Sequence, residues 1–175
     1  MVKIGELFPV FSLKAWGRNG IQDIKIDQYR GKWLVLFWYP ADFTFVCPTE
    51  VRGFHERYSE FQQASAEVLG ASVDSVWSHK AWIEKEWGSL AFPLLADANR
   101  EVIKLLGIDT EGDDGRVALR ATFIIDPEGK LRYQVVSDNN VGRSVEETLR
   151  VLKALQTGGL CPIEWKPGEE LLKGH

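Results

Sequence analysis

A short, continuous apolar stretch at residues 32–39 places the tightest constraint on how this chain can fold. It reads Lys-Trp-Leu-Val-Leu-Phe-Trp-Tyr and stops at Pro40, a pattern typical of a strand that is buried on both faces of a sheet. In residues 48–63, apolar side chains then recur every three or four positions, which predicts a helix with one apolar stripe. A buried strand followed by an amphipathic helix indicates an α/β fold.

Further elements continue this alternation. We expect strands at residues 67–73, 92–96, 120–125 and 130–137, and helices at 76–87, 100–106 and from Ser144 to Gly158. The last two strands flank Asp126-Pro127-Glu128-Gly129, a strong turn signal. Ser144 and Glu147 have the spacing of a capping box. The order predicts a sheet covered by helices, and the polar loop at 110–116 is given no role.

The composition excludes several classes of function. The 175 residues fit one domain, and 45% hydrophobic with 26% charged residues is close to the globular average. A net charge of −4, without basic runs interleaved with aromatic residues, gives no footprint for nucleic acid. No stretch approaches the roughly 18 apolar residues of a spanning helix, and residues 1–13 lack the core of a signal peptide. We therefore expect a soluble cytoplasmic protein that binds neither nucleic acid nor membrane.

The two cysteines, Cys47 and Cys161, are too few for a disulfide scaffold. Each precedes a proline, and no Cys-x-x-Cys is present, which argues against a dithiol exchange enzyme or a zinc site. Two buried structural thiols are the plain alternative. The three histidines, His55, His79 and His175, show no paired metal-ligand spacing, so we expect no metal, and nothing in the sequence calls for a cofactor.

The surroundings of Cys47 favour a chemical role. Pro48 disfavours helical geometry at Cys47 but suits the first helical position, so we expect Cys47 at the N-cap. The backbone N–H groups of Thr49 and Glu50 then lack helical acceptors and point toward the cap, where they and the helix dipole stabilise a thiolate. The carboxylate of Glu50 opposes this, so a cationic partner is required.

Arg120 is the first candidate for that partner. It begins the apolar strand expected at 120–125, where a charge is otherwise awkward, although an arginine at a strand end often keeps its head in solvent. Arg52 and Arg57 on the helix after Cys47, and Arg143, are rival candidates.

These residues carry a resemblance to a known family. The segment Pro40-x-x-x-Thr44-x-x-Cys47 resembles the active-site motif of peroxiredoxins, and residues 42–50 resemble their typical two-cysteine, AhpC-like branch. Four further segments are similar to the family in the same order, so that the resemblance covers nearly the whole chain. They are 72–75 with His79-x-x-Trp82, 120–129, 141–144 and 161–168.

The resemblance implies a thioredoxin-like α/β fold, with a central mixed β-sheet flanked by helices and a C-terminal extension. The corresponding division is a peroxidase domain over residues 1–157 and a tail over 158–175 that carries Cys161. The absence of a Gly-Gly-Leu-Gly insertion near residues 87–92, and of a C-terminal Tyr-Phe, resembles the bacterial type. We expect such an enzyme to resist overoxidation.

The resemblance also implies roles for the site residues. Cys47 attacks the O–O bond of a hydroperoxide and becomes a sulfenic acid, while Thr44 and Arg120 bind the peroxide. Pro40 covers the thiolate and limits the access of water. Glu50 orients the arginine rather than acting as a base.

For Cys161 the resemblance implies the role of resolving cysteine, supplied by the other subunit of a dimer. It forms an intersubunit disulfide with Cys47, which a thioredoxin or a flavoprotein reductase recycles. The family further implies an obligate homodimer that assembles into a ring of dimers, a decamer, with Phe43 and Phe45 packed between dimers. A one-cysteine peroxidase, and a chaperone or redox relay, are the alternatives.

Overall fold

A mixed seven-stranded sheet organises the chain up to Arg143. The computed structural model describes residues 2–174, and its backbone contacts divide it into two units, one ending at Arg143 and one beginning at Ser144. The strands of the sheet are β1 (Ser12–Gly17), β2 (Gly20–Lys25), β3 (Trp33–Trp38), β4 (Ala66–Ser72), β5 (Leu94–Ala96), β8 (Arg120–Ile125) and β9 (Leu131–Ser137). They lie in the order β2-β1-β5-β4-β3-β8-β9. Strand β4 runs parallel to β3 and β5, whereas the other pairs are antiparallel.

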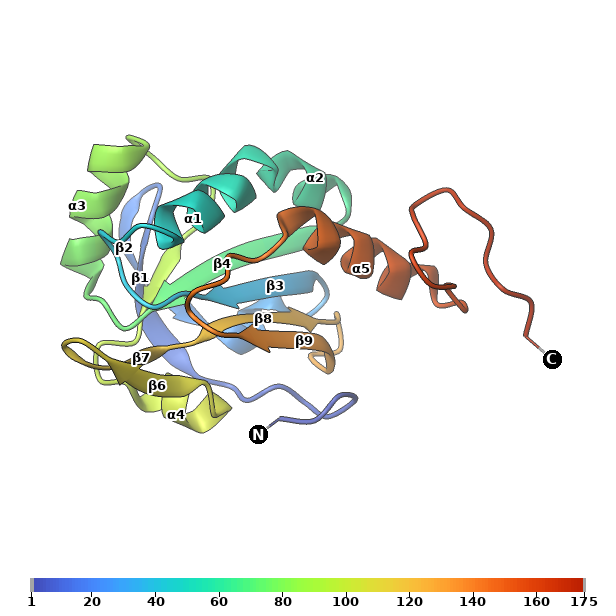
Figure 1. Cartoon of the computed structure of the whole chain (residues 1–175), viewed down its shortest axis with the longest axis horizontal. Coiled ribbons are helices and arrows are strands. Elements are labelled where there is room, and N and C mark those ends of the chain that lie inside the picture. Colours follow the sequence, from blue (N-terminus) through green and yellow to red (C-terminus); the bar gives the residue numbers. More distant parts are fainter. Residues whose placement is uncertain (1, 175) are drawn as a thin grey trace. The chain divides into compact units, whose positions relative to one another are not determined.

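Helices cover both faces of this sheet (Figure 1). Helices α1 (Cys47–Glu56), α2 (Tyr58–Gln63) and α3 (Val76–Glu86) lie on one face, and α4 (Glu101–Leu106) lies on the other. A short 3-10 helix, η1 (Ile26–Tyr29), follows β2. The predicted α/β class, with a buried strand at the centre, is confirmed.

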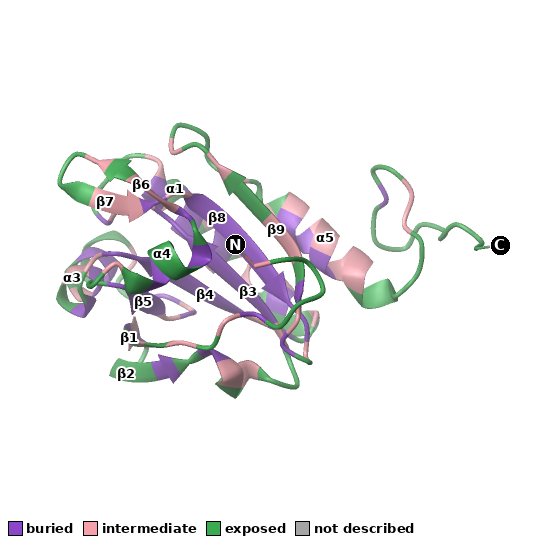
Figure 2. Cartoon of the chain, turned by 90° about the horizontal axis from the view of Figure 1, so that it is seen from below, coloured by how far each residue is buried: buried purple, intermediate pink, exposed green. Residues whose placement is uncertain are grey.

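The alternation of side chains along β3 explains why residues 32–39 are almost entirely apolar. Phe37 faces α1, where its ring stacks on Phe54 at 4.2 Å between centroids and meets Phe92 edge-on at 5.7 Å. Leu36 and Trp38 point to the opposite face, into the core cluster that includes Ile103 of α4. Figure 2 shows β3, β4 and β8 as buried strands at the centre of the sheet. Strand β3 therefore supports both helical layers and leads directly into the loop before α1.

The expected single helix over residues 48–63 is wrong. The chain forms α1 and α2 instead, separated at Arg57, whose φ of −103° and ψ of 11° leave the helical region. The guanidinium of Arg57 binds the carboxylate of Glu60. The apolar stripe nevertheless crosses the break, because Phe54 and Phe61 pack together with ring centroids 5.8 Å apart.

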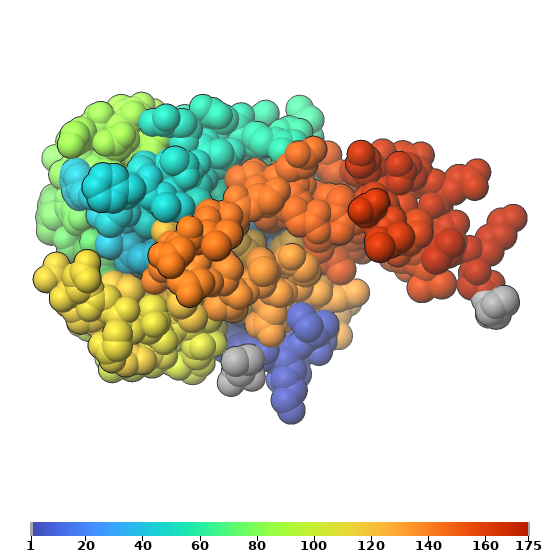
Figure 3. Space-filling model, in the orientation of Figure 1, coloured from blue at the N-terminus to red at the C-terminus, as the bar shows by residue number. Residues whose placement is uncertain are grey.

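The sequence patterns did not predict two of the hairpins. The β1–β2 hairpin lies at the edge of the sheet and has mixed exposure, so its apolar signal is weak. The stretch read as a polar loop forms β6 (Asp109–Gly112) and β7 (Gly115–Ala118), a separate hairpin at the surface, drawn in yellow in Figure 3. Ion pairs hold it, because Arg116 binds both Asp109 and Glu111 at 2.5 Å, and such a hairpin carries no apolar alternation.

The second unit consists of α5 (Val145–Thr157) and a C-terminal tail. The predicted start and end of α5 are confirmed: Ser144 accepts the N–H of Glu147 at 3.1 Å, and Gly158 closes the helix with a left-handed φ of 68°. Only half of a capping box forms, because the carboxylate of Glu147 pairs with Arg150. The expected division into residues 1–157 and 158–175 stays a prediction.

No helix within residues 2–174 is long and apolar enough to cross a membrane.

We predict that Leu69→Ala lowers the free energy of unfolding by about 2–5 kcal/mol, because it leaves a cavity in a packed core. Leu69 is 1% exposed on the central strand β4. Urea denaturation measures the change. The matched control is Leu105→Ala on α4, where the side chain is 53% exposed and a change within about 0.5 kcal/mol is expected. Equal losses in the two variants would contradict this assignment of the core.

Candidate active site

Cys47 lies at the first residue of α1, directly after the loop that follows β3. The expectation that Cys47 is the N-cap is wrong by one residue, because Val46 takes the cap position with φ −82° and ψ −39°. The carbonyl of Val46 accepts the backbone N–H groups of Thr49 at 3.0 Å and Glu50 at 3.4 Å, and also the Thr49 hydroxyl at 2.6 Å. The donors expected to face the sulfur are therefore bound to Val46, and Cys47 itself is only 1% exposed.

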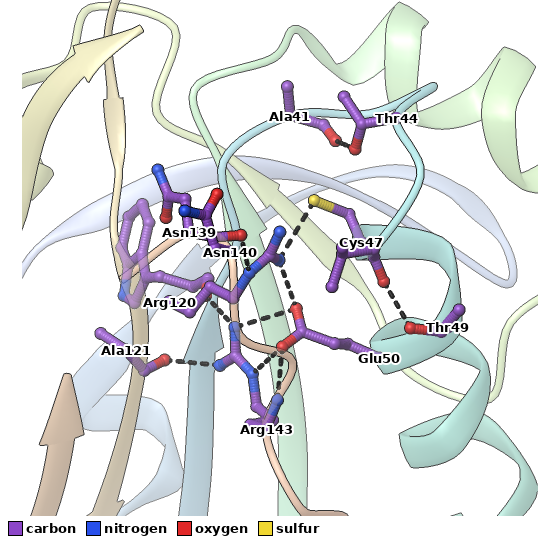
Figure 4. A network of polar contacts seen from close by, with 12 residues as sticks. Ala41, Thr44, Cys47, Thr49, Glu50, Arg120, Ala121, Asn139, Asn140 and Arg143 are labelled. Atoms are coloured by element: carbon purple, nitrogen blue, oxygen red, sulfur yellow. Dashed lines mark hydrogen bonds and ion pairs between the residues drawn. The ribbon is translucent and has the colours of Figure 1, made fainter. Parts of the chain in front are cut away.

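The cationic partner of the sulfur is Arg120. Its Nη1 donates to Cys47 Sγ at 3.3 Å and to Glu50 Oε2 at 2.7 Å, and its Nε donates to the carbonyl of Asn139 at 2.9 Å. Its side chain is 4% exposed, so the alternative of a solvated head is wrong. Figure 4 shows Arg120 reaching from β8 toward Cys47 and Glu50 on α1.

A second arginine completes the cluster. Arg143 donates to Glu50 Oε1 through its backbone N–H at 3.0 Å and its Nε at 2.9 Å, and to Oε2 through Nη2 at 3.2 Å. It also donates to the carbonyls of Ala121 and Trp38 and to the Thr122 hydroxyl. Burial lowers the pKa of Arg143, and the charge and hydrogen bonds of Glu50 oppose that change.

The charges of this cluster do not cancel. One carboxylate, Glu50, faces two guanidinium groups in a buried site, so one positive charge remains beside the Cys47 sulfur. In such low-dielectric surroundings a nearby cation strongly favours an anion. All four acceptor positions of the Glu50 carboxylate are filled by arginine N–H groups, which leaves none of them for a proton from another group.

The other predicted residues of the motif lie in the loop between β3 and α1. Thr44 is exposed, and its hydroxyl donates to the carbonyl of Ala41 at 2.9 Å; Figure 4 shows both on the loop near the Cys47 sulfur. Pro40 is half-buried at the start of the loop. Of the rival arginines, Arg52 is exposed and Arg57 binds Glu60, so neither takes the position of Arg120.

Cys161 belongs to the second unit. Its thiol lies 3.7 Å from the Ala154 carbonyl and 3.6 Å from the Thr157 hydroxyl, at the end of α5. Both cysteines are free thiols. The tail after Cys161 contacts α5, since Trp165 is 3% exposed and its carbonyl accepts from Arg150 at 3.1 Å.

Sequence reasoning gave no role to two buried residues, Asp42 in the loop between β3 and α1 and His79 on α3. His79, interpreted as a surface or packing residue, is fully buried, and its Nδ1 lies 2.7 Å from Asp42 Oδ2. The available signal was Asp42, the one charged residue in the loop over residues 40–46. His55 accepts the N–H of Ala91 at 3.1 Å, and His175 lies outside the described residues.

Comparisons with known proteins agree with this geometry. Residues 4–134 match the AhpC/TSA family. The chain is 50% identical over 176 residues to a Clostridium pasteurianum protein whose name places it among the peroxiredoxins, in a rubredoxin operon; the match covers 97% of this chain and 98% of that one.

Two solved structures are also similar. The reduced 2-Cys peroxiredoxin of Plasmodium vivax has a TM-score of 0.92 and 33% identity, covering 99% of this chain and 94% of its own. AhpC of Mycobacterium tuberculosis has a TM-score of 0.83 and 37% identity, covering 95% and 99%. These likenesses confirm the expected thioredoxin-like fold.

We predict that Glu50→Gln lowers the free energy of unfolding by about 3–5 kcal/mol, because it leaves two buried guanidinium groups without their carboxylate. Chemical denaturation measures the change. The matched control is Glu147→Gln, since Glu147 also binds an arginine through both oxygens but its side chain is 46% exposed. For that partly solvated pair we expect a loss of at most about 1 kcal/mol, and a loss as large as that of Glu50→Gln would contradict the role given to burial.

Proposed function

Because the chain belongs to the AhpC/TSA family and is a peroxiredoxin, a peroxidase, we propose that Cys47 is its nucleophile toward hydrogen peroxide and organic hydroperoxides. The observation that carries this proposal is the buried Arg120 guanidinium, which bridges Cys47 Sγ and Glu50. A guanidinium fork can bind the sulfur and a peroxide oxygen at once.

In the proposed first step, the Cys47 thiolate attacks the terminal oxygen of the hydroperoxide. A sulfur–oxygen bond forms, the O–O bond breaks, and its electron pair leaves on the second oxygen, which is protonated to water or an alcohol. Arg120 stabilises the charge that develops on that oxygen. Thr44 turns its hydroxyl from Ala41 to the peroxide, and Pro40 limits the access of water.

Glu50 acts as the residue that orients the arginines and not as a general base. Its side chain is 2% exposed, and both oxygens are held by Arg120 and Arg143. A carboxylate with filled acceptor positions is a poor proton acceptor but fixes its partners closely. Arg143 thereby acts through Glu50 on Arg120.

Cys161 is the proposed resolving cysteine. Its thiol attacks the Cys47 sulfenic acid, a disulfide forms between two subunits, and water is released. A dithiol protein, either a thioredoxin or a flavoprotein reductase, then reduces the disulfide. Mobility of the tail and of the first turn of α1 is required, because Cys47 is buried in the reduced state.

We further propose a homodimer that assembles into a ring. Strand β9 is an edge of the sheet, and Val135 and Val136 on it are exposed, as are Phe43 and Phe45 in the loop before Cys47. Exposed apolar groups of this kind are typical of surfaces that pair with another chain. Sedimentation of the reduced protein tests the assembly, and a monomer would contradict it.

The two-cysteine cycle predicts a dimer band on a non-reducing gel after one equivalent of peroxide, with a Cys47–Cys161 cross-link identified by mass mapping. Cys47→Ser and Cys161→Ser should each abolish the band. A wild-type monomer carrying sulfenic acid at Cys47 would instead support the one-cysteine alternative. A disulfide within a single chain would contradict the intersubunit step.

We also predict that Cys47 resists overoxidation, because residues 87–92 lack the Gly-Gly-Leu-Gly insertion that slows resolution in sensitive peroxiredoxins. With a recycling reductant present, mass spectrometry should find Cys47 free of sulfinic acid at peroxide levels just above stoichiometric. The control is Cys161→Ser, in which the sulfenic acid persists and should be oxidised further. Sulfinic acid in the wild type at these levels would contradict the prediction.

A further inference from the structure

The side chain of Asp42 connects the loop between β3 and α1 to helix α3. Its carboxylate is buried, and it accepts the Tyr39 hydroxyl at 2.8 Å on Oδ1 and the Ser78 hydroxyl at 2.9 Å on Oδ2. The Nδ1 atom of His79 lies 2.7 Å from the same Oδ2. Ser78 and His79 both belong to α3. A residue two positions before Thr44 is therefore held from outside the loop.

The partners of His79 define its charge. Its Nε2 lies 2.9 Å from the carbonyl of Leu95 on β5, and a carbonyl only accepts. The Asp42 carboxyl group faces Nδ1, so both ring nitrogens lie against oxygen atoms that can accept, an arrangement that favours the imidazolium form. Burial alone lowers the pKa of His79, but the hydrogen bond and charge of Asp42 raise it above the ordinary 6.5. Asp74 and Tyr39 are the other titratable groups near the ring.

The backbone of the same loop is held as well. The N–H of Asp42 donates to Asp74 Oδ2 at 2.9 Å, and Ser72 donates to that same oxygen at 2.5 Å. The next residue, Phe43, has a φ of 56°, a left-handed conformation that a bulky side chain adopts only where its surroundings enforce it. The loop is thus kept in a conformation that it would not adopt freely.

We propose that Asp42 and His79 are positioning residues for the peroxide site. Building on the proposed function of Cys47, they hold the loop over residues 40–46 so that Pro40 and Thr44 face the sulfur in the geometry that receives the peroxide. The charged pair links the loop to α3 and, through Leu95, to β5. Stability alone is a poor reason for such a pair, because well-packed apolar residues often replace buried ion pairs without loss.

Asp42→Asn and His79→Gln test the proposal through two reactions of Cys47. Stopped-flow oxidation by hydrogen peroxide should slow by about 10- to 100-fold, because the loss of alignment by about 1 Å has effects of that size. Alkylation by iodoacetamide should keep its wild-type rate and pH dependence, since it requires the thiolate but no peroxide alignment. Wild-type oxidation rates in both folded variants would overturn the proposal.

The matched control is Asp97→Asn. Asp97 is a buried carboxylate that accepts the backbone N–H groups of Glu101, Val102 and Ile103 at the start of α4, the helix on the face of the sheet opposite α1 and α3 (Figure 1). It should lose stability without a change in the oxidation rate. An equal slowing in Asp97→Asn would overturn the proposal in favour of a general effect of stability.

Two milder variants test the proposal if Asp42→Asn does not fold, and NMR tests the charge of His79. Tyr39→Phe and Ser78→Ala each remove one hydroxyl from Asp42 and should slow oxidation less, in the same direction. If Asp42→Asn does not fold, wild-type oxidation rates in both Tyr39→Phe and Ser78→Ala would overturn the proposal. Nitrogen NMR should show His79 as an imidazolium at neutral pH, and a neutral ring would contradict the charged pair. A wild-type chain whose Cys47 is not oxidised by peroxide would instead overturn the proposed function itself.

The pH dependence of the pair has a definite sign. Because the pKa of His79 is raised in the folded chain, the stability that the pair contributes is complete below the ordinary pKa of 6.5 and is lost as the pH rises through the folded value. His79→Gln should lose this alkaline decline of stability. An unchanged profile in that variant would contradict the assignment.

Discussion

The carboxylate of Glu50 is the point on which the arrangement of the site depends. It lies between two buried arginines and joins the first turn of α1 to β8 and to the segment that ends at Arg143. Burying three charges is unfavourable unless nearly every donor and acceptor is matched, and the acceptor positions of Glu50 are all filled. This matching fixes the guanidinium of Arg120 where it meets the sulfur, so the surroundings of Cys47 depend on a carboxylate one turn further along α1.

The sheet supplies the rigidity that this matching needs. Strand β3 is buried on both faces, because Phe37 packs against Phe54 of α1 and its neighbours pack toward α4. On the same strand, the Trp38 carbonyl accepts a hydrogen bond from Arg143. The helix that carries Cys47 and the arginines that face it are therefore anchored on adjacent strands, and a shift of either element would disturb both the core and the ion cluster.

The sequence predicts those parts of the fold that depend on local patterns. The strands around residues 32–39 and 120–125, the start of α5 at Ser144 and its end at Gly158 follow from periodicity and cap chemistry. Arg120 could be named because a charge beside a buried strand needs a partner. The position of Arg143 on Glu50 depends on contacts between residues 93 positions apart, which no local pattern encodes. The break at Arg57, the cap at Val46 and the ion-paired β6–β7 hairpin leave equally little periodic signal.

The near-complete burial of Cys47 restricts which molecules can reach its sulfur. With 1% of the residue exposed, the sulfur is shielded from bulky reagents, whereas the proposed reaction requires only one oxygen atom of a peroxide to reach it. In the proposed two-cysteine cycle, the same burial would keep Cys161 from the sulfur until the first turn of α1 opens. Such an opening would separate the sulfur from Arg120, whose Nη1 lies 3.3 Å from it in the closed site. If the proposed cycle holds, selectivity for the oxidant and protection of the oxidised cysteine would both follow from the burial of one sulfur atom.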